Sequence, residues 1–140
     1  MESWIVYALL SAGFAGVVGV TAKAGMGQIS GDLALAIRTA VIFALVAVHT
    51  LAGRYYAEAP RLSGRDWGLL AFSGAATMLS WLCYYRAVKL GPVSGVALLD
   101  KGSVLITVLL AVWLLGEPLT WRLALGGGLI VAGFLVLTLK

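Results

Sequence analysis

The sequence predicts an all-α integral membrane protein built from five transmembrane helices. Three observations support this fold class: the apolar composition, the spacing of the apolar stretches, and the aromatic residues at the ends of these stretches. Hydrophobic residues make up 61% of the 140 residues and charged residues only 11%, and the mean hydropathy is +1.01. Because a soluble domain carries roughly 25% charged residues, this is the composition of a membrane protein.

Five apolar stretches are long enough to cross a bilayer. A helix of about 20 residues, rising about 1.5 Å per residue, spans a hydrocarbon core of about 30 Å. The strands of a β-barrel would be shorter and would alternate strictly, and the sequence has neither property. We therefore expect one transmembrane domain over residues 1–140, with spans at about 4–22, 33–52, 67–87, 93–115 and 121–139.

The first stretch is expected to be a retained span rather than a cleaved signal peptide. Residues 22–24 (AKA) imitate a cleavage site, but Glu2 is the only charged residue before the apolar stretch. A signal peptide would begin with a positively charged region. The lone Cys83 permits no disulfide within one chain, so cysteine usage does not indicate a redox compartment.

The connectors contain residues that end one helix and start the next. Gly91 and Pro92 separate the third and fourth spans, and residues 116–118 (GEP) separate the fourth and fifth. Ser63 and Asp66 have the spacing of a capping box before the third span.

Aromatic residues at the span ends support the count of five. With five spans the termini lie on opposite faces, and we call the N-terminal face side A and the other face side B. Indole and phenol rings favour the headgroup zone, and six such residues fall at side-A ends. They are Trp4, Tyr55, Tyr56, Trp67, Trp113 and Trp121.

Positive charge is nearly balanced between the two faces, so the sequence does not select one orientation. The rule that Lys and Arg stay on the cytoplasmic face needs an asymmetry. Insertion in both orientations and a single orientation set by one dominant loop both remain open. Side A carries Arg54, Arg61, Arg65 and Arg122, and side B carries Lys23, Arg86, Lys89 and Lys140, with Arg38 as a candidate fifth.

Asp100 and Lys101 interrupt the apolar stretch at 93–115. Ionisable side chains at the centre of a span cost about 2.5–3.5 kcal/mol each on insertion scales, and they usually face protein or an aqueous cavity. Asp100 lies about 10 Å in from side B at helical rise, a depth similar to that of Arg38. Arg38 is therefore the first expected partner of Asp100, and Arg86 is the second.

Two interpretations of the charged residues remain open. In the functional one, a water-filled vestibule with excess positive charge attracts a polar or anionic solute, and aromatic residues line it by stacking. In the structural one, Asp100 and Lys101 form buried pairs that hold helices together, while Lys23, Arg86 and Lys89 extend to the headgroups. The candidate substrate-binding or coupling residues are Asp100, Lys101, Arg38, Arg86, Trp81 and Tyr85.

Several classes of function are not supported. The sequence contains no catalytic triad pattern, no metal-ligand spacing and no phosphate-binding loop, so we expect no enzyme, metal or cofactor. The net charge is +4, but the cations are scattered singly, which argues against nucleic-acid binding. His49 is expected to be an interfacial residue, and Glu117 a solvated residue in a turn.

Two segments carry a resemblance to a known family. Residues 84–94 (YYRAVKLGPVS) and 114–120 (LLGEPLT), followed by Gly126 and Gly133, resemble the EamA domain of the drug/metabolite transporter superfamily. Residues 22–25 (AKAG) also resemble the family pattern, and the similarity covers essentially the whole chain.

The resemblance implies a transporter of small polar metabolites or drugs in a cell membrane, expected to be the cytoplasmic membrane of a prokaryote. Most family members carry two five-helix units as an inverted pair, ten spans in all, around a central cavity. This sequence has one unit, so the resemblance implies a homodimer, with an antiparallel arrangement favoured by the charge balance. The alternative is a non-transporting membrane subunit whose buried charges specify helix pairing.

Overall fold

The computed structural model describes residues 3–138, which form helices and turns without any strand. The chain divides after Leu90 into two compact units, called here the first unit (3–90) and the second unit (91–138). Leu139, which ends the fifth expected span, lies outside the described residues, as do Glu2 and Lys140.

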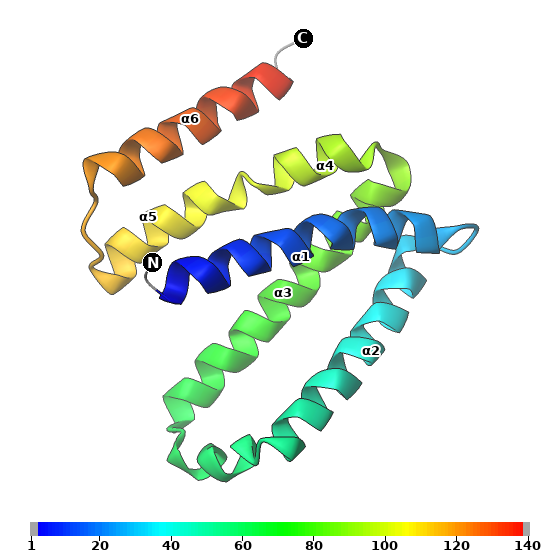
Figure 1. Ribbon diagram of the computed structural model, residues 1–140, viewed down its shortest axis with the longest axis vertical. Coiled ribbons are helices and arrows are strands. Elements are labelled where there is room, and N and C mark those ends of the chain that lie inside the picture. The colour runs from blue at the N-terminus through cyan, green and yellow to red at the C-terminus, as the bar shows by residue number, and fades with distance from the viewer. Residues whose placement is uncertain (1–2, 139–140) are drawn as a thin grey trace. The chain divides into compact units, whose positions relative to one another are not determined.

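The first unit contains three long helices and one short one. Helices α2 and α3 form an antiparallel hairpin through the 3-10 helix η1, and α1 packs against both of them (Figure 1). The short helix η1 lies in the connector between these two helices. The bounds are α1 Ser3–Met26, α2 Gly31–Ala52, η1 Tyr55–Arg61 and α3 Gly64–Leu90.

Both helices of the hairpin begin at a capped N-terminus. The Ser30 hydroxyl oxygen accepts the Leu33 N–H at 3.2 Å at the start of α2. At the start of α3, the Asp66 N–H donates to the Ser63 hydroxyl oxygen at 3.2 Å, and the Ser63 N–H donates to the Asp66 carboxylate at 2.9 Å. The predicted capping box is confirmed. These bonds satisfy N–H groups that the first turn of a helix leaves unpaired.

The start of α2 lies directly on the backbone of α3. A Cβ atom added at Gly31 would lie 2.8 Å from the carbonyl oxygen of Tyr85, a distance that real Cβ contacts do not reach. Leu35, Tyr85 and Val88 are buried at this contact end of the hairpin. Glycine is therefore required for the two helices to approach this closely.

The second unit contains α4 (Val93–Asp100), α5 (Ser103–Leu115) and α6 (Trp121–Thr138), and α6 packs against both of the others. Gly91 and Pro92 separate α3 from α4 as predicted. Gly116 ends α5 with a φ of 69°, a left-handed conformation that glycine adopts without strain.

The expected span at 93–115 is long and apolar enough to cross a bilayer, and it contains a short turn that the sequence did not predict. Lys101 and Gly102 form a turn between α4 and α5. Across this turn the amides of Lys101, Gly102, Val104 and Leu105 each bond the carbonyl three residues back, at 3.0–3.2 Å. This is the tighter 3-10 pattern, whose hydrogen bonds have poorer geometry than those of an α-helix. The fourth span therefore contains one 3-10 turn directly after Asp100, at Lys101 and Gly102, whose backbones stay in the right-handed helical region.

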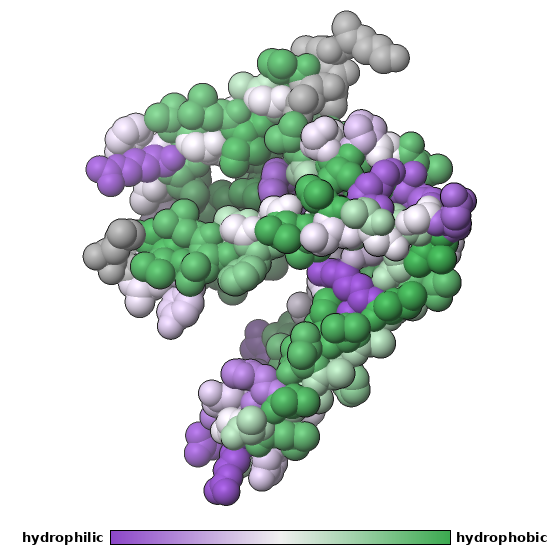
Figure 2. Space-filling model, turned by 45° about the vertical axis from the view of Figure 1, so that its right-hand side comes forward, coloured by the Kyte–Doolittle hydropathy of each residue, from purple (hydrophilic) through white to green (hydrophobic). Residues whose placement is uncertain are grey.

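The helices have the length and surface of membrane spans. Four stretches, Ser3–Met26, Gly31–Ala52, Gly64–Leu90 and Val93–Leu115, are long and apolar enough to cross a bilayer, and α6 is apolar but shorter over Trp121–Val136. Large apolar side chains are widely exposed, including Phe14, Phe43 and Phe72 at 73–75%. Figure 2 shows these apolar surfaces along the helices, with hydrophilic residues at the η1 end of the hairpin. The chain is a multi-pass integral membrane protein.

Candidate functional site

The first unit contains an open pocket of about 320 Å³ between α1, α2 and α3, which is called the cavity below. This volume lies at the small end of the range found for sites that bind small molecules. All of its lining residues belong to the first unit, and most of them are aliphatic. They are Val18, Thr21, Ala22, Gly25, Ile29, Ala34, Ile37, Arg38 and Tyr85.

Arg38 is the charged residue in the wall of this cavity. Its guanidinium carbon lies 4.2 Å from the centre of the Trp81 ring and 5.7 Å from that of Tyr85. Trp81 and Tyr85 are about one turn apart on α3, so both lie on the same face of that helix. A cation–π contact of a partly buried arginine contributes about 1 kcal/mol. The sequence named all three residues as candidates, and the structure brings them together.

The donors of Arg38 are not used by a carboxylate among residues 3–90. Thr21 also lines the cavity. Its hydroxyl donates within its own helix to the carbonyls of Val17 and Val18, at 2.9 and 3.2 Å. The guanidinium of Arg38 therefore supplies the charged N–H donors at the cavity.

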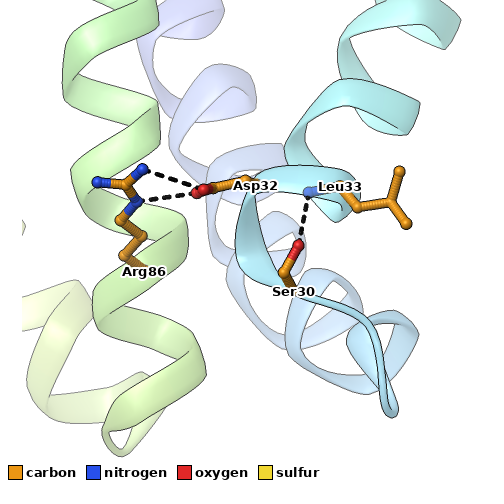
Figure 3. A network of polar contacts seen from close by, with 4 residues as sticks. All are labelled: Ser30, Asp32, Leu33 and Arg86. Atoms are coloured by element: carbon orange, nitrogen blue, oxygen red, sulfur yellow. Dashed lines mark hydrogen bonds and ion pairs between the residues drawn. The ribbon is translucent and has the colours of Figure 1, made fainter.

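Arg86 pairs with a carboxylate that the sequence analysis did not single out. Its Nε and Nη2 donate to the two oxygens of Asp32 at 2.9 and 3.0 Å, a bidentate ion pair between α3 and α2 (Figure 3). The two side chains remain 59% and 49% exposed. The available signal was the position of Asp32 two residues after the Ser30 cap, where an acidic residue favours a helix N-terminus. Arg86 does not line the cavity.

Lys23 and Lys89 tie the end of α3 to the end of α1. The Lys23 ammonium donates to the carbonyl of Val88 and, at 3.2 Å, to that of Lys89, and both carbonyls lie in the last turn of α3. The Lys89 ammonium donates to the Gly27 carbonyl at 2.7 Å. These bonds satisfy carbonyls that a helix end leaves unpaired. Both lysines thus have partners in the protein, beyond the headgroup contacts that the structural interpretation expected.

Asp100 and Lys101 lie at the break between α4 and α5 in the second unit. Both are exposed, and neither side chain has a hydrogen bond or an ion pair with another described residue of that unit. The expected pairing of Asp100 with Arg38 or Arg86 joins residues of different units, and it stays a prediction.

The remaining candidates have ordinary surroundings. His49 lies in the last turn of α2 with its ring 5.5 Å from that of Tyr55, and Glu117 is an exposed residue of the turn after α5. Among residues 3–138, no group of three or more His, Cys, Asp or Glu side chains could hold a metal ion.

Comparison with known proteins gives matches over nearly the whole chain. The model of the EamA-like transporter family matches residues 2–139. A protein of Sinorhizobium sp., described as an uncharacterized transporter in the cobO 3′ region, is 44% identical over 136 residues, which cover 97% of this chain and 96% of that protein. No solved structure matches. Both matches are to transporters.

Proposed function

We propose that this chain, which belongs to the EamA-like transporter family, moves small polar metabolites or drugs across a membrane by alternating access. The observation that carries the proposal is the cavity of the first unit, where Arg38 lies against Trp81 inside a span. A charged residue within a span usually marks a path for a solute or an ion. The relative from Sinorhizobium sp. is described as a transporter and aligns with this chain over nearly the whole length of both proteins, which supports a transport function.

The proposed working form is a homodimer of two oppositely oriented chains. Secondary transporters commonly place an inverted pair of units around a site near the bilayer midplane. One chain would contribute five spans, namely α1, α2, α3, the broken α4–α5 segment and α6, so a pair would supply ten. The near balance of Lys and Arg between the two faces supports insertion in both orientations.

Asp100 and Lys101 are the proposed coupling residues. They interrupt the fourth span at a turn, and transporters commonly use broken helices to present backbone and side-chain groups to solutes and ions. Asp100 is the carboxylate in the middle of a span, so it is the residue proposed to exchange a proton if transport is proton-coupled.

Solute flux into liposomes that contain the purified protein tests this function. Labelled amino acids, organic acids and quaternary ammonium compounds form the panel of solutes, with and without a pH gradient. We expect flux of at least one solute class, and we expect Asp100→Asn to abolish it at unchanged expression. The matched control is Glu117→Gln, which neutralises the exposed carboxylate after α5 in the same unit.

Two results would contradict the proposal. Normal flux by Asp100→Asn would remove the coupling role of that residue. Absence of flux for the whole panel, with correctly inserted protein, would leave the non-transporting membrane subunit as the better description.

A further inference from the structure

We propose that the cavity of the first unit binds a solute with one carboxylate and an apolar body, and that Arg38 receives the carboxylate. This inference names the substrate class of the proposed transport site, and its biological role rests on the proposed function. The binding itself is a property of residues 18–85 and is measurable without transport.

The apolar part of the solute is indicated by the cavity wall. Six of the nine lining residues are aliphatic or glycine, so the wall offers few polar groups to replace lost water. A wholly hydrophilic solute would lose the hydration of the surface that contacts this wall, with little compensation. Burial of an apolar body is instead favourable, at about 25 cal/mol per Å² of apolar surface removed from water.

The anionic part is indicated by the charge of the wall. None of the nine lining residues is acidic, and the donors of Arg38 have no carboxylate partner among residues 3–90. The guanidinium lies over the Trp81 ring, and a cation–π contact uses the charge of this group rather than hydrogen bonds from its N–H groups. Those groups match the two oxygens of a carboxylate.

The solute is expected to carry only one negative charge, because the other cations near this end of the hairpin already have partners in the protein. Arg86 is already paired with Asp32, and Lys23 and Lys89 already donate to backbone carbonyls. Arg38 is therefore the cation left for a ligand at the cavity. Burying a second negative charge there without a second cation would be strongly unfavourable.

A matched series of three probes tests the charge preference. We would titrate 3-phenylpropanoate, 3-phenylpropanamide and 3-phenylpropylamine into the full chain in phosphatidylcholine nanodiscs and measure binding by calorimetry. We expect the carboxylate to bind at least tenfold more tightly than the amide, and the amine to bind most weakly. Equal affinities, or tightest binding of the amine, would overturn the inference.

Two pairs of variants place the site. Arg38→Gln should remove the preference for the carboxylate, whereas Arg122→Gln, which changes an arginine near Trp121 outside the cavity, should retain it. Gly25→Leu should fill the cavity and weaken all binding, whereas Gly13→Leu on the same helix should not. A Cβ at either glycine has open space within 4 Å, so both variants are expected to fold. Unchanged carboxylate binding in Gly25→Leu would overturn the placement.

An anionic lipid headgroup could satisfy Arg38 by the same chemistry, and a second membrane composition distinguishes the two sources. If a free carboxylate is the ligand, its affinity should be similar in nanodiscs with and without phosphatidylglycerol once bulk surface charge is matched by salt. A tenfold loss in phosphatidylglycerol would assign Arg38 to lipid and overturn the inference. Carboxylate binding without flux of any solute would support the inference while contradicting the proposed function.

Discussion

Arg38 and Arg86 are arginines in the spans of the same unit, and they satisfy their charges in different ways. Arg86 forms two hydrogen bonds to Asp32, so its charge is compensated by the protein. Arg38 lies over an aromatic ring, which stabilises the cation without using its edge donors. Arg38 is therefore the residue proposed to bind a ligand, whereas the sequence placed both arginines among the candidate site residues and ranked Arg38 first only as the partner of Asp100.

Gly31 sets the distance between the two helices that carry these arginines, so its replacement should be damaging. In Gly31→Ala the new Cβ would meet the Tyr85 carbonyl oxygen at 2.8 Å, and α2 and α3 would have to separate. We expect a loss of about 1–3 kcal/mol in the free energy of unfolding, as for other overpacked sites, measured by denaturation in mixed micelles.

The matched control is Gly64→Ala, at the first residue of α3, where a Cβ meets nothing within 4 Å. It should be neutral or slightly stabilising, because alanine is the better helix former. Equal stability of the two variants would contradict the close approach of α2 and α3.

At the scale of elements, the break between α4 and α5 is the main departure from a regular span. The four amides that cross it bond carbonyls three residues back, and Gly102 at its centre faces Phe134 of α6. A Cβ at Gly102 would lie 3.2 Å from the Phe134 ring and 3.2 Å from the Leu99 carbonyl oxygen. The turn is therefore held by a side chain from a neighbouring helix as well as by its own backbone.

The weaker hydrogen bonds of this turn should appear in amide exchange. We expect the amides of residues 101–105 to exchange about tenfold faster than those of residues 107–112 of α5, because 3-10 bonds are poorly aligned and flank two exposed charges. Hydrogen–deuterium exchange of the protein in nanodiscs, read by mass spectrometry, measures the difference. Uniform protection from residue 96 to residue 112 would indicate one continuous helix instead.

The sequence predicted the element ends better than their interiors. Gly91, Pro92 and Gly116 mark real ends, and the Ser63–Asp66 capping box forms as expected, because such signals act within a few residues. The turn at Gly102 was not predicted, since a glycine within an apolar stretch is assigned to a helix unless the residue packed against it is known. That residue, Phe134, lies 32 residues away in the chain.

The candidate site was predicted in part for the same reason. Arg38 was named for its depth in the second span, and Trp81 and Tyr85 as aromatic residues able to line a cavity, and the three side chains lie together. The partner of Arg86 was missed because Asp32 had been assigned to the connector before the second span, whereas α2 begins at Gly31. Composition shows which charges are unusual, but only the contact between two helices shows which of them are paired.

At the scale of the whole molecule, the apolar helices and the family place the chain in a membrane as a transporter. The near balance of Lys and Arg between the two faces can be tested, because a few added lysines on one face should fix the orientation of the chain in the membrane. Gln28→Lys with Ser94→Lys adds charge to side B, and Ala57→Lys with Leu119→Lys adds charge to side A.

If the working form is an inverted pair, each double variant expressed alone should lose most of its transport, and co-expression of the two should restore it. Accessibility of tags on both termini reports the orientation, and solute flux reports the activity. The parent chain should show each terminus on both faces. Full flux from either double variant alone would exclude the inverted pair.

If the cavity is the solute site, its position within one unit determines how many solute molecules the proposed assembly holds. All nine lining residues come from the first 90 residues, so the pocket is repeated in every chain. Saturation binding should then reach one solute per chain, or two per pair. A site shared by two chains at a two-fold axis would instead saturate at one solute per pair. The binding stoichiometry therefore distinguishes a pocket within each chain from a pocket shared between chains.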